Sequence, residues 1–239
     1  MEPPFPCPTP TWHNDSYSAI DPMKPELSQA GKTVVITGAG SGIGRQTSIA
    51  FAKAGAKHVV LIGRTEASLL ETQGLLAGET TTSSVFAASV IDQARMQQIA
   101  EAVGTWDILI LNAGHISTPG PLTSAPLDDY WLNFETNVKS VVIASQAFVP
   151  TATALGAAVY AISSGALVLP TKATAYLSTY LSSKVAQVKV MEYLAVENPN
   201  LFVCSVHPGM VETKIFSASG TKPEQLPMDA VELPANFLV

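Results

Sequence analysis

Short hydrophobic runs alternate with segments of helical spacing from residue 31 onward. The runs are apolar or rich in β-branched residues, which is typical of buried strands. They predict strands at Thr33–Thr37, His58–Ile62, Val85–Ala88, Ile108–Leu111, Ala157–Ser163 and Phe202–Val206. Between them, apolar positions at helical spacing predict helices at Ser41–Ala54, Glu66–Leu76, Gln93–Val103, Leu127–Phe148 and Tyr176–Glu197. Buried strands that alternate with helices predict an α/β fold, namely a doubly wound parallel sheet with helices on both faces.

The beginning of the chain has a different composition, because seven of the 17 prolines lie within residues 1–25. Proline fixes the φ angle and has no backbone N–H, so this stretch is unsuited to a helix or sheet interior. We therefore predict an extended arm over residues 1–30 and one α/β domain over residues 31–239. The arm has no basic region followed by an apolar core, so we expect no signal peptide.

The composition narrows the class of protein further. Of the 239 residues, 47% are hydrophobic and only 13% are charged, which excludes a disordered chain. A net charge of −6 without a basic cluster argues against a nucleic-acid partner. Two cysteines indicate a reducing compartment, so we expect a cytoplasmic protein, and the four scattered histidines predict no metal site.

One uncharged stretch, from Ser140 to Thr171, is long enough to cross a bilayer. However, Gln146, Pro150 and Gly156 interrupt it, and its pattern changes from a helix to a short strand. We therefore expect no transmembrane span.

A glycine-rich segment joins the first strand to the first helix, with the sequence TGAGSGIG from Thr37 to Gly44. Glycines allow the backbone to turn sharply and to approach a pyrophosphate, whose charge is favourable at the N-terminus of the next helix. A tight strand-to-helix connection would need similar glycines. The phosphate-binding hypothesis assigns cofactor contacts to Thr37, Gly38, Ser41, Gly42, Ile43 and Gly44.

Tyr180 and Lys184 lie four positions apart, so on a helix their side chains share one face. A free tyrosine has a pKa of about 10. A neighbouring ammonium group favours the phenolate and lowers this pKa, which would make the phenol a usable proton-transfer group. Tyr176 shares the register but has no lysine four positions later. A tyrosine and a lysine at this spacing also occur by chance on unrelated helices.

Together these motifs resemble the short-chain dehydrogenase/reductase family, whose order they follow from Gly31 to Thr213. Asn112-Ala113-Gly114 is similar to the family segment that supports the sheet beside the adenosine. The resemblance implies a catalytic tetrad of Asn137, Ser164, Tyr180 and Lys184, with Ser163 as the competing hydroxyl. It also implies a Rossmann-type domain and nicotinamide contacts from Pro208, Gly209, Val211 and Thr213, with Lys139 as a nearby charge.

The position after the second strand bears on the choice of cofactor. A carboxylate here binds the ribose 2′-hydroxyl of NAD, whereas this chain has Arg64, which can pair with the 2′-phosphate of NADP. We therefore expect NADP(H) rather than NAD(H). Glu66 lies close by, but an acid at the start of a helix also serves the helix dipole. Arg45 either adds positive potential or is a solvated helix residue.

The expected activity is hydride transfer between the nicotinamide and the carbonyl or secondary alcohol of a small hydrophobic substrate. The resemblance to fungal members further implies a role in secondary metabolism. The predicted helices Leu127–Phe148 and Tyr176–Glu197 resemble those that pair subunits in relatives, which implies a possible homo-oligomer. The chain departs from the family at Ser89, where an aspartate is usual, and in the long spacing between Ser164 and Tyr180. It also ends at Val239, so we expect it to lack the last strand and C-terminal segment of the family.

Two other functions remain open at this point. The short C-terminus allows a catalytically weak nucleotide-binding or regulatory protein. A sugar-nucleotide epimerase or dehydratase would share the Tyr-Lys pair, but the chain is short for one.

Overall fold

The computed structural model describes residues 11–78 and 80–239. Its centre is a parallel six-stranded sheet in the order β3-β2-β1-β4-β5-β6. The order reverses between β1 and β4, as in a doubly wound Rossmann-type sheet, so the predicted fold class is confirmed. The strands are β1 (Thr33–Thr37), β2 (His58–Gly63), β3 (Thr82–Ala87), β4 (Ile108–Leu111), β5 (Ala158–Ile162) and β6 (Phe202–Val206).

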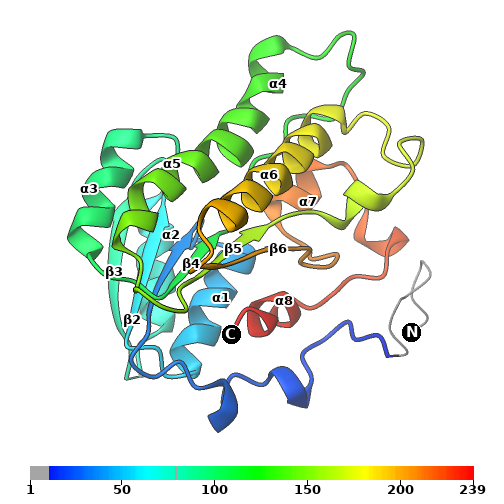
Figure 1. Ribbon diagram of the computed structural model, residues 1–239. Coiled ribbons are helices and arrows are strands. Elements are labelled where there is room, and N and C mark those ends of the chain that lie inside the picture. The colour runs from blue at the N-terminus through cyan, green and yellow to red at the C-terminus, as the bar shows by residue number, and fades with distance from the viewer. Residues whose placement is uncertain (1–10, 79) are drawn as a thin grey trace.

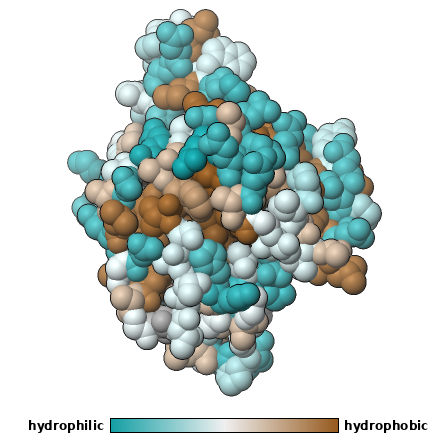
Figure 2. Space-filling model, turned by 90° about the vertical axis from the view of Figure 1, so that its left-hand side faces the viewer, coloured by the Kyte–Doolittle hydropathy of each residue, from teal (hydrophilic) through white to brown (hydrophobic). Residues whose placement is uncertain are grey.

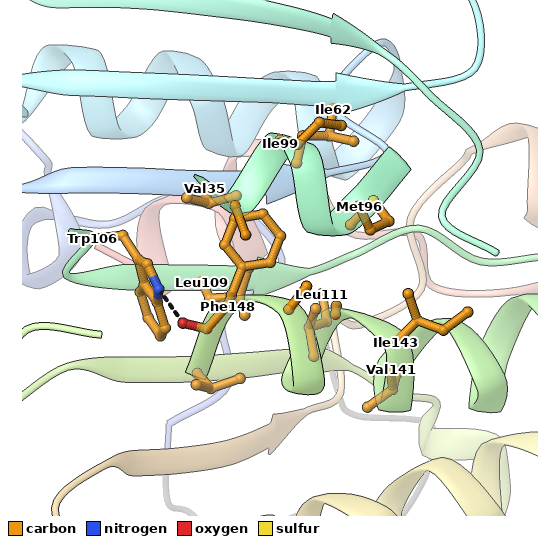
Figure 3. Packing of buried hydrophobic residues seen from close by; sticks show 14 of the residues in the cluster. Val35, Ile62, Met96, Ile99, Trp106, Leu109, Leu111, Val141, Ile143 and Phe148 are labelled. Atoms are coloured by element: carbon orange, nitrogen blue, oxygen red, sulfur yellow. Dashed lines mark hydrogen bonds between the residues drawn. The ribbon is translucent and has the colours of Figure 1, made fainter. Parts of the chain in front are cut away.

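Helices cover both faces of the sheet (Figure 1). Neighbouring residues of a strand point to opposite faces, so Val35 packs beneath α3, α5 and α6, whereas Val34 packs beneath α1 and α2. On the first face, the indole Nε1 of Trp106 donates to the carbonyl of Phe148 at 2.8 Å within the apolar core (Figure 3). The helices are α1 (Gly42–Lys53), α2 (Glu66–Leu75), α3 (Gln93–Val103), α4 (Leu127–Phe134), α5 (Ser140–Phe148), α6 (Ser178–Glu197), α7 (Lys214–Ala218) and α8 (Glu232–Phe237).

Two predicted helices differ from those observed by more than one residue at an end. A π-helical turn, Glu135–Lys139, separates α4 from α5, so the expected single helix is in three parts. The helix α6 begins at Ser178 because Tyr176 has a φ of 72°, a left-handed conformation that an α-helix excludes. Tyr176 therefore lies outside the helix that carries Tyr180.

The residues after Thr213 help to cover one face of the sheet. The helix α8 lies beside α1, and Leu238 is buried with Phe51 in the core of that face (Figure 1). The amide of Gln29 donates to the Val239 carbonyl at 2.6 Å. No strand follows β6 in the described residues, so β6 is an edge strand of this sheet. The expected lack of a further strand and C-terminal segment stays a prediction.

The N-terminal arm also contacts the residues near the end of the chain. The backbone N–H of Ala230 donates to the carbonyl of Asn14 at 2.8 Å, and the Asn236 amide donates to the Ser16 hydroxyl at 2.7 Å. The first ten residues of the predicted arm lie outside the described residues. The boundary at residue 30 stays a prediction.

The helix α4 projects from the body of the molecule (Figure 1). Leu127 and Trp131 on this helix are exposed. The projecting lobe at the top of Figure 2 carries hydrophobic surface beside hydrophilic surface. No helix within residues 11–78 and 80–239 has both the length and the apolar character needed to cross a bilayer.

Candidate active site

The glycine-rich loop is held by the segment that follows the neighbouring strand. The Thr37 hydroxyl accepts from the backbone N–H groups of Asn112 and Ala113 at 3.0 and 3.1 Å. In return, the Asn112 amide donates to the carbonyls of Thr37 and Gly38 at 3.0 and 3.2 Å. Since β1 and β4 are adjacent parallel strands, these bonds join the glycine-rich loop to the Asn112–Gly114 segment at the carboxyl ends of the two strands.

The glycines of the loop are required by close packing. Gly38 has a φ of 67°, and a Cβ atom there would lie 2.8 Å from the Asn112 amide. A Cβ at Gly44 would collide with the same amide and with the Gly38 carbonyl. Gly42 has a φ of 51° and lies against the methyl group of Thr213. The three residues that a Cβ would meet, Asn112, Gly38 and Thr213, each come from a different predicted cofactor segment.

The N-terminus of α1 lies directly after this loop. The first N–H groups of a helix have no intrahelical acceptor, and the Ser41 side chain caps none of them within the described structure. Uncapped N–H groups at the positive end of a helix suit an anionic phosphate. The geometry of the loop therefore fits a dinucleotide, with Ile43 in the first turn of the helix.

The π-helical turn places Asn137 at the centre of the site. Asn137 is fully buried, and its Oδ1 accepts from the His115 N–H at 2.8 Å. Its Nδ2 donates to the His115 carbonyl and to the Ser183 hydroxyl, each at 2.9 Å. Asn137 thus joins the loop after Gly114 to α6 beside Lys184. An extra residue in a helical turn is often found at functional sites.

Lys184 is buried beneath the end of β5. Its Nζ donates to the Ile162 carbonyl at 2.6 Å and to Gln187 Oε1 at 3.1 Å, and lies 5.9 Å from the centre of the Tyr180 ring. Burial lowers the pKa of Lys184 to about 7. Gln187 was not anticipated from the sequence, because no motif there marks it.

The surroundings of Tyr180 differ from the expectation. Burial raises the pKa of its phenol, and a hydrogen bond with the Ser164 side chain only partly offsets this. The pKa of Tyr180 therefore moves in the direction opposite to the expected one, and the phenol is protonated at neutral pH. Of the two candidate hydroxyls, Ser164 is therefore the one beside Tyr180, whereas the buried Ser163 Oγ has no partner in the described part of the chain.

The segment after β6 closes the site on the other side. The His207 Nδ1 accepts from the Gly165 N–H at 2.8 Å, directly beside Ser164.

Asp229 Oδ2 accepts from the Met210 N–H at 2.6 Å and contacts Gly209, which has a φ of 80°. Asp229 was also missed, because it lies in a loop with no recognisable motif. Val211 pairs with Asp229 in a β-bridge, and Thr213 caps α7 by accepting from the Phe216 N–H.

The two arginines considered for cofactor binding differ in whether they already have an acidic partner. Arg64 directly follows β2, is exposed, and forms no ion pair with any described residue. Arg45 donates to the Gly40 carbonyl at 2.7 Å and pairs with Glu71 at 2.8 Å, so its guanidinium is already engaged by the loop and by an acidic partner.

Lys139 pairs with Glu135 at 2.9 Å on an exposed part of the π-helical turn, and its role as a cofactor contact stays a prediction. Residues 11–78 and 80–239 contain no cluster of three or more potential metal ligands.

Comparisons with known proteins agree with this geometry. Residues 32–224 match the model of the short chain dehydrogenase family. The chain is 30% identical to the short chain dehydrogenase andI of Emericella variicolor over 95% of its length and 80% of that protein. It is 32% identical to the short chain dehydrogenase pigC of Monascus ruber, with 95% and 77% covered. Among solved structures, 3-ketoacyl-(acyl-carrier-protein) reductase from Brucella melitensis, complexed with NADH, is 25% identical with a TM-score of 0.72, and 80% of each chain is covered.

Proposed function

Because the chain belongs to the short chain dehydrogenase family, we propose that it is an NADP(H)-dependent oxidoreductase that interconverts a carbonyl and a secondary alcohol on a small hydrophobic substrate. The observation that carries this proposal is the meeting of Ser164, Tyr180 and Lys184 at the ends of β5 and α6. A role in secondary metabolism is part of the same proposal.

The binding of the cofactor is assigned to the loop and its supports. The α1 N-terminus would hold the pyrophosphate through the backbone of Ser41, Gly42 and Ile43. Asn112, Ala113 and Gly114 would line the adenosine side, and the segment from Pro208 to Thr213 would face the nicotinamide. When bound, NADP(H) supplies or accepts the hydride.

The protonation chemistry is assigned to the side chains of the tetrad. Tyr180, which is protonated at neutral pH, donates its proton to the substrate oxygen in the reductive direction. The Ser164 hydroxyl orients that oxygen and stabilises its developing charge. The ammonium of Lys184 stabilises the phenolate that remains, and Asn137 holds the Ser183 turn of α6 in place.

The choice of NADP(H) rests on Arg64. Its exposed guanidinium has no acidic partner in the described chain, so it is available to form charge-assisted hydrogen bonds with a 2′-phosphate. Arg45 is not available in this way, because Glu71 and the loop carbonyl already engage it.

The proposed substrate class follows from the loop after β4. A hollow of about 380 Å³ is lined by small and proline residues between Thr118 and Asp129, and Asp129 is the one charged residue among those that line it. The N–H of Gly120 donates to the Tyr176 carbonyl, so this loop lies beside the residues that precede α6. Such a lining favours an uncharged, hydrophobic molecule.

The test is NADPH oxidation in the presence of a panel of hydrophobic ketones and aldehydes. We expect turnover with some of them, and we expect Tyr180→Phe to abolish it while NADPH binding, measured by calorimetry, is retained. Tyr176→Phe is the matched control and should keep turnover, because Tyr176 lies outside α6. NADPH binding without turnover on any carbonyl would instead support the nucleotide-binding regulatory alternative.

A further inference from the structure

Gln187 lies one helical turn after Lys184 and is almost completely buried, with 1% of its surface exposed. Its Oε1 faces the Lys184 ammonium at 3.1 Å. Its Nε2 is buried without a hydrogen-bond partner among the described residues. Burying an amide with an unpaired donor is unfavourable, so a glutamine here needs a reason.

The surroundings of Lys184 supply that reason. The Ile162 carbonyl is the only other acceptor bound to Nζ within the described chain. Tyr180 is the one titratable group beside the ammonium, and within the described residues α4, the π-helical turn, α5, β5 and β6 present no charged side chain to it. A buried ammonium without a carboxylate depends on neutral acceptors.

We propose that Gln187 is a positioning residue that, together with the Ile162 carbonyl, holds Lys184 Nζ beside Tyr180 and stabilises its protonated form. This inference rests on the proposed function, in which that ammonium supports the phenolate of Tyr180. A neutral amide suits the role, because a carboxylate would form an ion pair and weaken the effect of the charge on Tyr180. Two of the three ammonium donors are engaged, so one stays free of described partners for the bound cofactor.

The inference predicts the direction of the change when the acceptor is removed. Without Gln187 Oε1 the charged form of Lys184 loses a hydrogen bond, so its pKa falls. Lys184 then becomes neutral at a lower pH, and the alkaline fall of reductive turnover moves to lower pH as well. A carboxylate at the same position would act in the opposite direction.

The experiment is an NMR titration of the full chain with ε-¹³C-labelled lysine, in which Lys184→Met identifies the Lys184 signal. Gln187→Met keeps the side-chain length and removes the acceptor, and we expect it to lower the Lys184 pKa by roughly one unit. We expect Gln187→Glu to raise it. Gln97→Met on the exposed face of α3 is the matched control and should leave it unchanged.

A Lys184 pKa that stays within about 0.3 units of the parent value in Gln187→Met would overturn the proposal, as would a decrease in Gln187→Glu. If Gln187→Met does not fold, the direction seen in Gln187→Glu decides the matter. The pH profile of kcat provides the second readout and should shift in the same direction as the pKa. The NMR titration needs no turnover, so an inactive parent enzyme would contradict the proposed function and leave the role of Gln187 to be decided separately.

Discussion

The imidazole Nδ1 of His207 accepts a hydrogen bond from the backbone N–H of Gly165 at 2.8 Å. This contact requires an unprotonated Nδ1, so the neutral ring carries its proton on Nε2. The ring also lies directly over Gly165, where any Cβ atom would collide with it. His207 therefore holds the residue next to Ser164, and does so only in its neutral form.

This contact predicts a loss of activity in acid. Surrounding protein atoms lower the pKa of His207 below 6.5 by desolvation, although the Asp229 carboxylate acts against this. The contact is thus intact at neutral pH and is lost as the pH falls through that lowered pKa. We expect kcat/KM to fall in acid, and we expect His207→Asn to flatten this fall, because Asn places a non-titrating acceptor near the Nδ1 position.

The Asp229 carboxyl group lies beside His207 and also titrates, and burial raises its pKa. Asp229→Asn should therefore be compared in the same assay. If His207→Asn retains the parental acid fall and Asp229→Asn removes it, the role assigned to His207 is wrong.

The left-handed backbone at Tyr176 predicts a stabilising substitution. A bulky residue at a φ of 72° is strained, whereas asparagine tolerates this conformation. Tyr176→Asn should raise the free energy of unfolding by about 0.5–1 kcal/mol in chemical denaturation. Tyr193→Asn is the control, because Tyr193 is similarly exposed but lies within α6. A gain of the same size in both variants would refute the explanation by backbone strain.

Two glycines predict opposite effects of the same substitution. Gly44→Ala would push a methyl group into the Asn112 amide and the Gly38 carbonyl, so we expect a loss of about 1–3 kcal/mol and weaker NADPH binding. Gly74 in α2 has nothing within 4 Å of its would-be Cβ in the described chain. Gly74→Ala should therefore stabilise the protein by about 0.5–1 kcal/mol. Thermal and chemical denaturation measure both effects, and a neutral Gly44→Ala would contradict the packing of the loop.

The cofactor preference is tested at Arg64. Arg64→Asp should weaken NADPH binding by about 10- to 100-fold, because it removes charge-assisted bonds and adds repulsion. It should not weaken NADH binding, because a carboxylate at this position can bind the ribose 2′-hydroxyl. Arg45→Ala is the comparison, since Arg45 is bound to Glu71 and to the Gly40 carbonyl. It should lower stability without altering the ratio of the two affinities. Equal affinity of the parent for both cofactors, unchanged in Arg64→Asp, would refute the preference.

Much of the fold follows from local patterns. The bounds of β1, α3, β4 and β6 agree with the sequence prediction to the residue, because apolar runs and helical spacing act over short distances. The prediction failed where backbone conformation departs from these periods. Neither the π-helical turn around Asn137 nor the left-handed Tyr176 leaves a periodic signal.

The candidate residues could be found from motifs, but their environment could not. The spacing of Tyr180 and Lys184 indicated a charge effect on the phenol, whereas in the structure burial raises the pKa of Tyr180. Desolvation depends on every element packed around a group, so the local sequence does not contain it.

The sequence by itself determined the parallel α/β sheet and the glycine-rich turn, since each depends on residue types at short spacing. The tetrad was predicted from the family resemblance and stays a prediction. Only the tertiary structure decided that Gln187 faces Lys184, that His207 holds Gly165, and that Leu238 is buried beside α1. The last two contacts join residues far apart in the chain, and the first depends on which face of α6 is buried. The two distant contacts arise from tertiary packing, which no spacing along the chain encodes, and the burial of the Gln187 face of α6 depends on the elements packed around that helix.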